Sequence, residues 1–162
     1  MERICLFPGT FDPVTLGHTD IIDRALGLFD KVIIGIGRNI NKQPMFSEQV
    51  RLNWLREIYA GNPQVDATVY EGLTVDCCRQ VGATYILRGI RYVNDFEYEK
   101  AIADMNRSLA GEIETIFLTC LPQYTSVAST LVRDVLRNGG DVSAFLPDAV
   151  NDHIQEMSKA RK

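Results

Sequence analysis

The chain has 162 residues, a formal net charge of −4, and 46% hydrophobic and 23% charged residues. This size and composition predict a single domain, residues 1–162, that buries a core without disulfides. The acidic balance argues against a protein that binds nucleic acid or an anionic membrane, because such binding needs a basic surface. A locally basic pocket for a small anion is compatible with it.

The sequence contains no apolar segment of membrane-spanning length, and its N-terminus lacks the pattern of a signal peptide. Its four cysteines, Cys5, Cys77, Cys78 and Cys120, form no metal-binding motif. We therefore expect no membrane association, free thiols and a cytoplasmic location.

Apolar, β-branched segments alternate with helical patterns along the chain. Strands are predicted at residues 4–7, 32–36, 65–70, 85–87 and 113–118. Helices are predicted at residues 17–29, 47–60, 73–81, 94–110, 127–138 and 147–160. This alternation indicates an α/β protein with a five-stranded parallel sheet and helices on both faces, a Rossmann-like dinucleotide-binding fold.

The first predicted strand leads through Pro8-Gly9 into a loop and then into a helix that begins near Gly17. Free N–H groups and the dipole at a helix N-terminus favour a bound anion. The helix has an apolar face, and His18 lies on that face in the first turn. His18 is therefore predicted at the carboxyl edge of the sheet, where ligands bind. A core histidine bound to a backbone carbonyl is the alternative.

Cationic side chains follow four of the five predicted strands. They are His18 after the first strand, Arg38 and Lys42 after the second, Arg88 and Arg91 after the fourth, and Arg133 after the fifth. Such a basic rim on an acidic protein predicts a small ligand with several phosphates. Singly, each of these residues has a simpler interpretation: Lys42 as a surface lysine, and Arg88 and Arg91 as solvated loop charges.

Several familiar motifs are absent from the sequence. The Gly35-Ile-Gly37 segment is not the dinucleotide fingerprint, because its third glycine is missing, and no Gly-Lys-Ser/Thr phosphate loop occurs. The chain has only two histidines, His18 and His153, so few residues could act as the base of a nucleophilic triad. These absences favour a reaction that works by positioning and charge neutralisation, such as phosphoryl or nucleotidyl transfer.

Two segments carry a family resemblance. Thr15-Leu-Gly-His18 resembles the T/HxGH motif of the nucleotidyltransferase superfamily, and residues 127–133, Val-Ala-Ser-Thr-Leu-Val-Arg, are similar to its ISSTxxR signature. Nearly the whole chain resembles the bacterial phosphopantetheine adenylyltransferases. Further support comes from Arg88-Gly-Ile-Arg91, from residues 94–99 and from Met105-Asn106.

The resemblance implies an enzyme that transfers AMP from ATP to 4′-phosphopantetheine, giving dephospho-coenzyme A and pyrophosphate. The attack on the ATP α-phosphorus would be direct, with no covalent intermediate. Mg²⁺ would accompany ATP, with no metal ligand from the protein. The members of this family form homohexamers and are inhibited by coenzyme A through feedback, so the resemblance implies both properties for this chain.

The resemblance also assigns roles to individual residues, with His18 as the donor that stabilises charge at the transferring phosphorus. The catalytic residues would be His18, Thr10, Lys42 and Arg91. Phosphopantetheine would bind to Thr10, Lys42, Thr74 and Arg88. ATP would bind to Thr10, Phe11, His18, Gly89, Ile90, Arg91, Glu99, Tyr124, Thr125, Ser126, Val127, Ala128, Ser129 and Thr130.

The chain departs from the family pattern at two positions. Ala128 replaces a serine of the second signature, and Thr74 replaces a residue that is often larger and apolar. On helix 94–110, Tyr98, Ile102 and Met105 have the spacing of core residues, although the family uses this region for the substrate channel and subunit contacts.

Two other functions stay open at this point. One is another adenylyl- or cytidylyltransferase, acting on nicotinamide mononucleotide or glycerol phosphate. The other is a non-catalytic nucleotide-binding module on the same fold.

Overall fold

Residues 1–160 are described by a computed structural model, in which five strands form one parallel sheet. The strands are β1 (Ile4–Gly9), β2 (Lys31–Gly37), β3 (Val65–Tyr70), β4 (Tyr85–Ile90) and β5 (Glu114–Thr119). Their order is β3-β2-β1-β4-β5, so successive strands are added toward one edge from β1 to β3 and toward the other edge from β4 to β5, while β1 and β4 stay parallel. Ligands of open α/β sheets bind at such a switch point, beyond the carboxyl ends of the strands.

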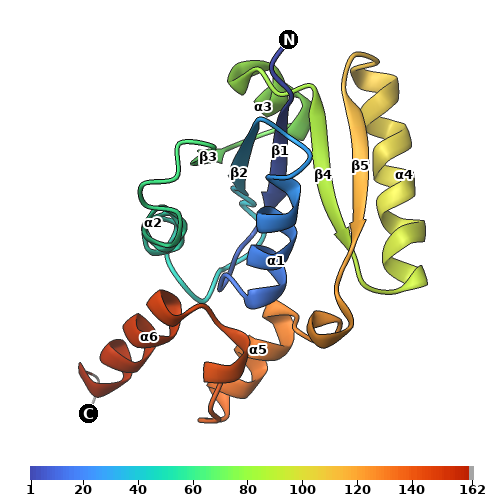
Figure 1. The fold of residues 1–162 in the computed structure, drawn as a ribbon. Helices are drawn as coiled ribbons and strands as arrows, with labels where there is room; N and C mark the ends of the chain where they lie inside the picture. The colour runs from blue at the N-terminus through green and yellow to red at the C-terminus, as the bar shows by residue number, and fades with distance from the viewer. Residues whose placement is uncertain (161–162) are drawn as a thin grey trace.

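Helices cover both faces of this sheet, as predicted. They are α1 (Leu16–Ala25), α2 (Glu48–Ile58), α3 (Thr74–Val81), α4 (Val93–Leu109), α5 (Ser129–Arg137) and α6 (Asp148–Ala160), with 3-10 turns at Pro122–Tyr124 and Ser143–Phe145. One core cluster packs α1, α2, α5 and α6 against β1 and β2. A second cluster packs α3 against the other face. In Figure 1 the arrowheads of β4 and β5 point downward, to the end of the fold at which α5 lies.

Two strands extend at least two residues beyond their predicted carboxyl ends. β1 continues through Pro8 to Gly9, because its ladder with β2 pairs Gly9 with Ile36. β4 continues to Ile90 in register with β5. Arg88 is consequently a strand residue rather than a loop residue, and its backbone is held on the β5 side.

The exposed side chains of α4 correct another expectation. Tyr98 is 70% and Met105 68% exposed, and Val93 and Leu109 on the same helix are also exposed. Glu99 is the buried residue of α4. The core interpretation was therefore wrong for Tyr98 and Met105, because α4 packs at the β4–β5 edge of the sheet with no further layer outside it.

The cysteines have the state that the sequence predicted. Cys5, Cys77 and Cys78 are buried, Cys120 is half-buried, and all four are free. Within residues 1–160, no helix is both long enough and apolar enough to cross a membrane.

Candidate active site

The carboxyl ends of the strands open into a cavity of about 1160 Å³. A smaller cavity of about 680 Å³ adjoins it, and Thr10, Arg88 and Glu99 line both. The predicted site residues on the larger cavity are Thr10, Phe11, His18, Lys42, Arg88, Gly89, Arg91, Glu99, Tyr124, Val127, Ala128, Ser129 and Thr130. Thr74 lines the smaller cavity. Ile90, Thr125 and Ser126 line neither.

His18 is held by the first turn of α1. Thr15 is the N-cap of this helix, and its side chain accepts a hydrogen bond from the backbone N–H of His18. In return, the backbone N–H of Thr15 donates to Nδ1 of His18 at 3.0 Å. Because Nδ1 accepts this bond, the neutral ring carries its proton on Nε2. The Thr-x-x-His spacing therefore fixes the tautomer of the histidine.

The surroundings of His18 keep its ring neutral. Its ring centroid lies 4.9 Å from that of Phe11 and 6.4 Å from that of Phe7. Burial and the positive charges of Arg88 and Arg91 lower the pKa of His18 from 6.5 to about 4. At neutral pH the side chain is a neutral Nε2–H donor on the wall of the larger cavity.

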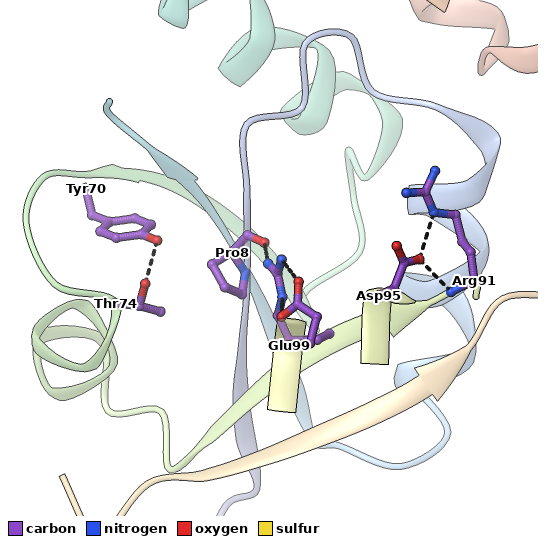
Figure 2. A network of polar contacts seen from close by, with 7 residues as sticks. Pro8, Tyr70, Thr74, Arg91, Asp95 and Glu99 are labelled. Carbon is purple, nitrogen blue, oxygen red and sulfur yellow. Dashed lines mark hydrogen bonds and ion pairs between the residues drawn. The ribbon is translucent and has the colours of Figure 1, made fainter. Parts of the chain in front are cut away.

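Arg88 is bound within the protein on two sides. Its Nε and Nη2 atoms donate to the two carboxylate oxygens of Glu99 at 2.7 and 2.5 Å, and Nη1 donates to the carbonyl of Pro8 at 2.5 Å (Figure 2). This two-pronged ion pair joins β4, α4 and β1 where the two cavities meet. The family resemblance assigned the two residues to different substrates, whereas the structure brings them together.

Arg91 retains free hydrogen-bonding capacity. Its backbone N–H and its Nε donate to Asp95 at 3.0 and 3.2 Å (Figure 2). The two terminal nitrogens of its guanidinium form no hydrogen bond within residues 1–160. Lys42, in the loop after β2, likewise forms no ion pair within that range and lines the larger cavity. Both side chains are available to an anion.

The N-terminus of α5 forms another wall of the larger cavity. Its N-cap is Ala128, which makes no side-chain capping bond. The hydroxyl of Ser129 donates to the carbonyl of Pro13 at 2.8 Å and so joins α5 to the loop after β1. With no capping side chain, the first N–H groups of α5 are left for a ligand or water.

This chain is similar to known proteins over most of its length. The family model described as cytidylyltransferase-like matches residues 6–135. A phosphopantetheine adenylyltransferase of Flavobacterium psychrophilum is 51% identical over 148 residues, which is 91% of this chain and 97% of that protein. One of Aromatoleum aromaticum is 44% identical over 161 residues and covers 99% of both chains.

The chain belongs to the phosphopantetheine adenylyltransferase family. Its members share a nucleotidyltransferase fold with more distant enzymes. A solved structure from Vibrio parahaemolyticus, provisionally assigned as a nicotinate-nucleotide adenylyltransferase, superposes with a TM-score of 0.71 at 19% identity. The superposition covers 96% of this chain and 93% of the Vibrio parahaemolyticus chain. This similarity shows the fold alone.

Within this family fold, the structure adds two buried charged residues to the cavity wall that the sequence analysis did not assign. Asp12 and Arg51 are 3% and 5% exposed, and both line the larger cavity. Arg51 has a sequence signal, because it lies one turn before Trp54 and Leu55 on the apolar face of α2. A charged side chain on such a face is costly unless it has a specific partner.

Proposed function

We propose that the protein transfers AMP from ATP to 4′-phosphopantetheine, giving dephospho-coenzyme A and pyrophosphate. The relatives that support this are named phosphopantetheine adenylyltransferase. The proposal rests on the surroundings of His18. This neutral donor lies on the wall of the larger cavity with Arg88 and Arg91, and the smaller cavity adjoins the larger one. Such a site suits a reaction between two phosphates.

In the proposed reaction, an oxygen of the acceptor's phosphate attacks the α-phosphorus of ATP. The bond from that phosphorus to the bridging oxygen of pyrophosphate breaks, and pyrophosphate leaves with the electron pair. The ionised phosphate is itself the nucleophile, so the protein need not remove a proton. Nε2–H of His18 donates to the α-phosphate, where charge develops, and Arg91 helps to neutralise it.

The two cavities suit the two substrates. ATP occupies the larger one, against Phe11, Gly89, Glu99, Tyr124 and residues 127–130. The pantetheine arm occupies the smaller one, beside Thr74, and Thr10, Lys42 and Arg88 hold its phosphate near the junction. Before any substrate binds, Arg88 is paired with Glu99, and this ion pair fixes the direction of the guanidinium of Arg88.

Mg²⁺ accompanies ATP in this proposal. Within residues 1–160, no three His, Cys, Asp or Glu side chains are grouped as a metal site. The carboxylates on the larger cavity, Asp12, Glu48, Asp95 and Glu99, all accept hydrogen bonds from protein N–H groups. Phosphate oxygens and water suit Mg²⁺ as ligands, and the bound ion would offset the charge of the leaving pyrophosphate.

We further propose a cytoplasmic homohexamer that coenzyme A inhibits. The four free cysteines suit a reducing compartment. The exposed apolar side chains of α4 suit contacts between copies of the chain. Coenzyme A carries the same pantetheine arm as the acceptor, so the smaller cavity can accommodate its arm.

Replacing His18 tests the proposed chemistry. We expect His18→Ala to lower kcat by about 10²–10³-fold or more, because it removes a donor that acts in the transition state. ATP should still bind. Pyrophosphate release measures turnover, and calorimetry measures ATP affinity. The control is His153→Asn, which keeps an acceptor for Nε1–H of Trp54. Near-normal turnover of His18→Ala would remove the histidine from the mechanism.

A panel of acceptors tests the choice of substrate. The purified protein is offered 4′-phosphopantetheine, nicotinamide mononucleotide and glycerol phosphate, each with ATP that carries its label in the AMP part. We expect label in dephospho-coenzyme A only. Transfer to either of the other acceptors at a higher kcat/KM would replace the proposed function, and ATP binding without any transfer would indicate a non-catalytic module.

A further inference from the structure

Arg51 is a buried cation with an unusual set of partners. Its side chain leaves the apolar face of α2 and is almost completely enclosed, with 5% of the residue exposed. Nε donates to the carbonyl of Phe46 at 3.0 Å, and Nη1 donates to the carbonyl of Thr10 at 2.7 Å. Within residues 1–160, no carboxylate oxygen lies within 4.0 Å of its nitrogens. A buried charge that binds only backbone carbonyls is costly, so a role beyond packing is expected.

Asp12 makes the reciprocal connection. Its carboxylate accepts from the backbone N–H of Met45 at 2.8 Å and from that of Phe46 at 2.9 Å. Asp12 and Arg51 take part in four hydrogen bonds. Two join Asp12 to residues 45–46, which precede α2, and the other two connect Arg51 on α2 to Phe46 and to Thr10, which follows β1. We call these two side chains and their four bonds the Asp12–Arg51 clamp.

The clamp encloses a backbone that needs support. Phe11 has a φ of 52°, a left-handed conformation that is costly for a residue with a bulky side chain. Arg51 holds the carbonyl on one side of Phe11, at Thr10. On the other side, Nη1 of Arg133 donates to the carbonyl of Asp12 at 2.7 Å. The position of Thr10 at the junction of the two cavities therefore depends on bonds made by buried or half-buried arginines.

We propose that Arg51 is a positioning residue for AMP transfer, which acts by holding Thr10 against the acceptor's phosphate. This inference rests on the proposed function. The guanidinium is a rigid fork, and it reaches carbonyls of two separate segments at once. A lysine has a single ammonium group on a flexible stem and cannot reproduce that geometry. The loop would then hold Thr10 less precisely while the charge is retained.

The first experiment compares Arg51→Lys with the wild-type protein. Small misplacements at a reacting centre cost up to about 10²-fold in rate. We expect kcat to fall by about 10-fold or more and KM for 4′-phosphopantetheine to rise several-fold. Affinity for a non-reactive ATP analogue should change by less than about 2-fold. Equal changes in both affinities with unchanged kcat would overturn the proposal.

Arg79→Lys is the matched control. Arg79, like Arg51, donates to more than one group, here Glu112, Asp76 and the carbonyl of Leu109, but it lies on α3, outside both cavities. It should keep wild-type kinetics. A loss of kcat in Arg79→Lys equal to that in Arg51→Lys would overturn the proposal, because the effect would then be general to arginines of the fold.

A double-mutant cycle tests whether Arg51 acts through Thr10. If it does, Arg51→Lys should lower kcat/KM by less than about 3-fold in a Thr10→Ala background, since the group it positions is already gone. A merely structural role predicts the same loss in both backgrounds, and that result would overturn the proposal.

Asp12→Asn decides the matter if Arg51→Lys does not fold. An asparagine keeps one acceptor oxygen but loses the other, so it weakens the clamp while leaving Arg51 in place. We expect the same split between kcat, acceptor KM and ATP affinity, and the same loss of effect in the Thr10→Ala background. Wild-type kinetics of Asp12→Asn would overturn the inference alone. A wild-type protein that makes no dephospho-coenzyme A would overturn the proposed function instead.

Discussion

His18 shows how a few neighbours decide the chemistry of one side chain. Thr15 fixes which ring nitrogen carries the proton, and burial with Arg88 and Arg91 keeps the ring neutral. At neutral pH the uncharged ring still donates a hydrogen bond from Nε2–H, which a phosphate oxygen can accept. The role of His18 as a donor in the reaction stays a prediction, and the structure shows the tautomer and the neutral state that this role would need.

The neutral state of His18 can be measured directly. We expect its ring to titrate at about pH 4 in the protein without ligands. An NMR titration of the ring protons provides the measurement. His153→Asn leaves one histidine in the chain and so assigns the signal. A midpoint at or above pH 6 would contradict the proposed environment.

The same shift in pKa makes stability depend on pH. The folded pKa of His18 is about 4 and the unfolded value is 6.5, so the unfolded chain binds more protons between these values. The contribution of neutral His18 to the free energy of unfolding is therefore present above pH 6.5 and is lost as the pH falls toward 4. Between pH 7 and 4.5, the free energy of unfolding should fall by about 2 kcal/mol more in the wild type than in His18→Gln. Urea unfolding at the two pH values measures this, and equal losses would refute it.

At the level of elements, the glycines of β2 serve strand packing. Gly35-Ile-Gly37 runs beside β3, and the register pairs Gly37 with Tyr70. A Cβ on Gly35 would lie 2.9 Å from Cδ1 of Leu6 and 3.1 Å from Cε1 of Tyr70. The segment is thus explained by close packing around the Tyr70 ring, whose hydroxyl lies 3.0 Å from that of Thr74 (Figure 2).

Replacing Gly35 tests this explanation. We expect Gly35→Ala to lower the free energy of unfolding by about 1–3 kcal/mol, because the added methyl overpacks the core. Gly111→Ala is the control, since its Cβ would meet only the carbonyl oxygen of Arg107, at 3.8 Å. Chemical denaturation of both variants provides the comparison. A Gly35→Ala protein as stable as the control would mean that the sheet adapts to the methyl.

For the molecule as a whole, the surface of α4 is the feature that a single chain leaves unexplained. Val93 is 73% exposed, and Tyr98, Met105 and Leu109 are also more than half exposed. Exposed apolar side chains gathered on one helix are typical of protein–protein contacts. This face lies on the opposite edge of the fold from α6 (Figure 1).

The proposed hexamer is testable through this face. Sedimentation should give the wild type a mass six times that of one chain. Val93→Glu should give a smaller species, because a buried unpaired charge opposes association. Leu28→Glu changes an exposed leucine outside α4 and should leave the assembly intact. A wild-type monomer, or an unchanged mass for Val93→Glu, would remove α4 from the assembly.

Local patterns determined much of this protein. Apolar strands and helix periodicity depend on neighbours along the chain, so the five-stranded sheet with helices on both faces was correctly predicted. The Thr15–His18 motif is local as well, since one helical turn contains both residues. The motifs also pointed to the family that the comparisons then showed.

Only the tertiary structure decided how distant charges pair. Arg88 with Pro8 and Arg51 with Thr10 join segments that are 80 and 41 residues apart, and no local pattern specifies such partners. The exposed face of α4 also depends on where the sheet ends rather than on helix spacing. The periodicity of apolar residues indicates which side chains are buried away from water. The orientation of a charged group depends instead on the partner that the fold brings within hydrogen-bond distance.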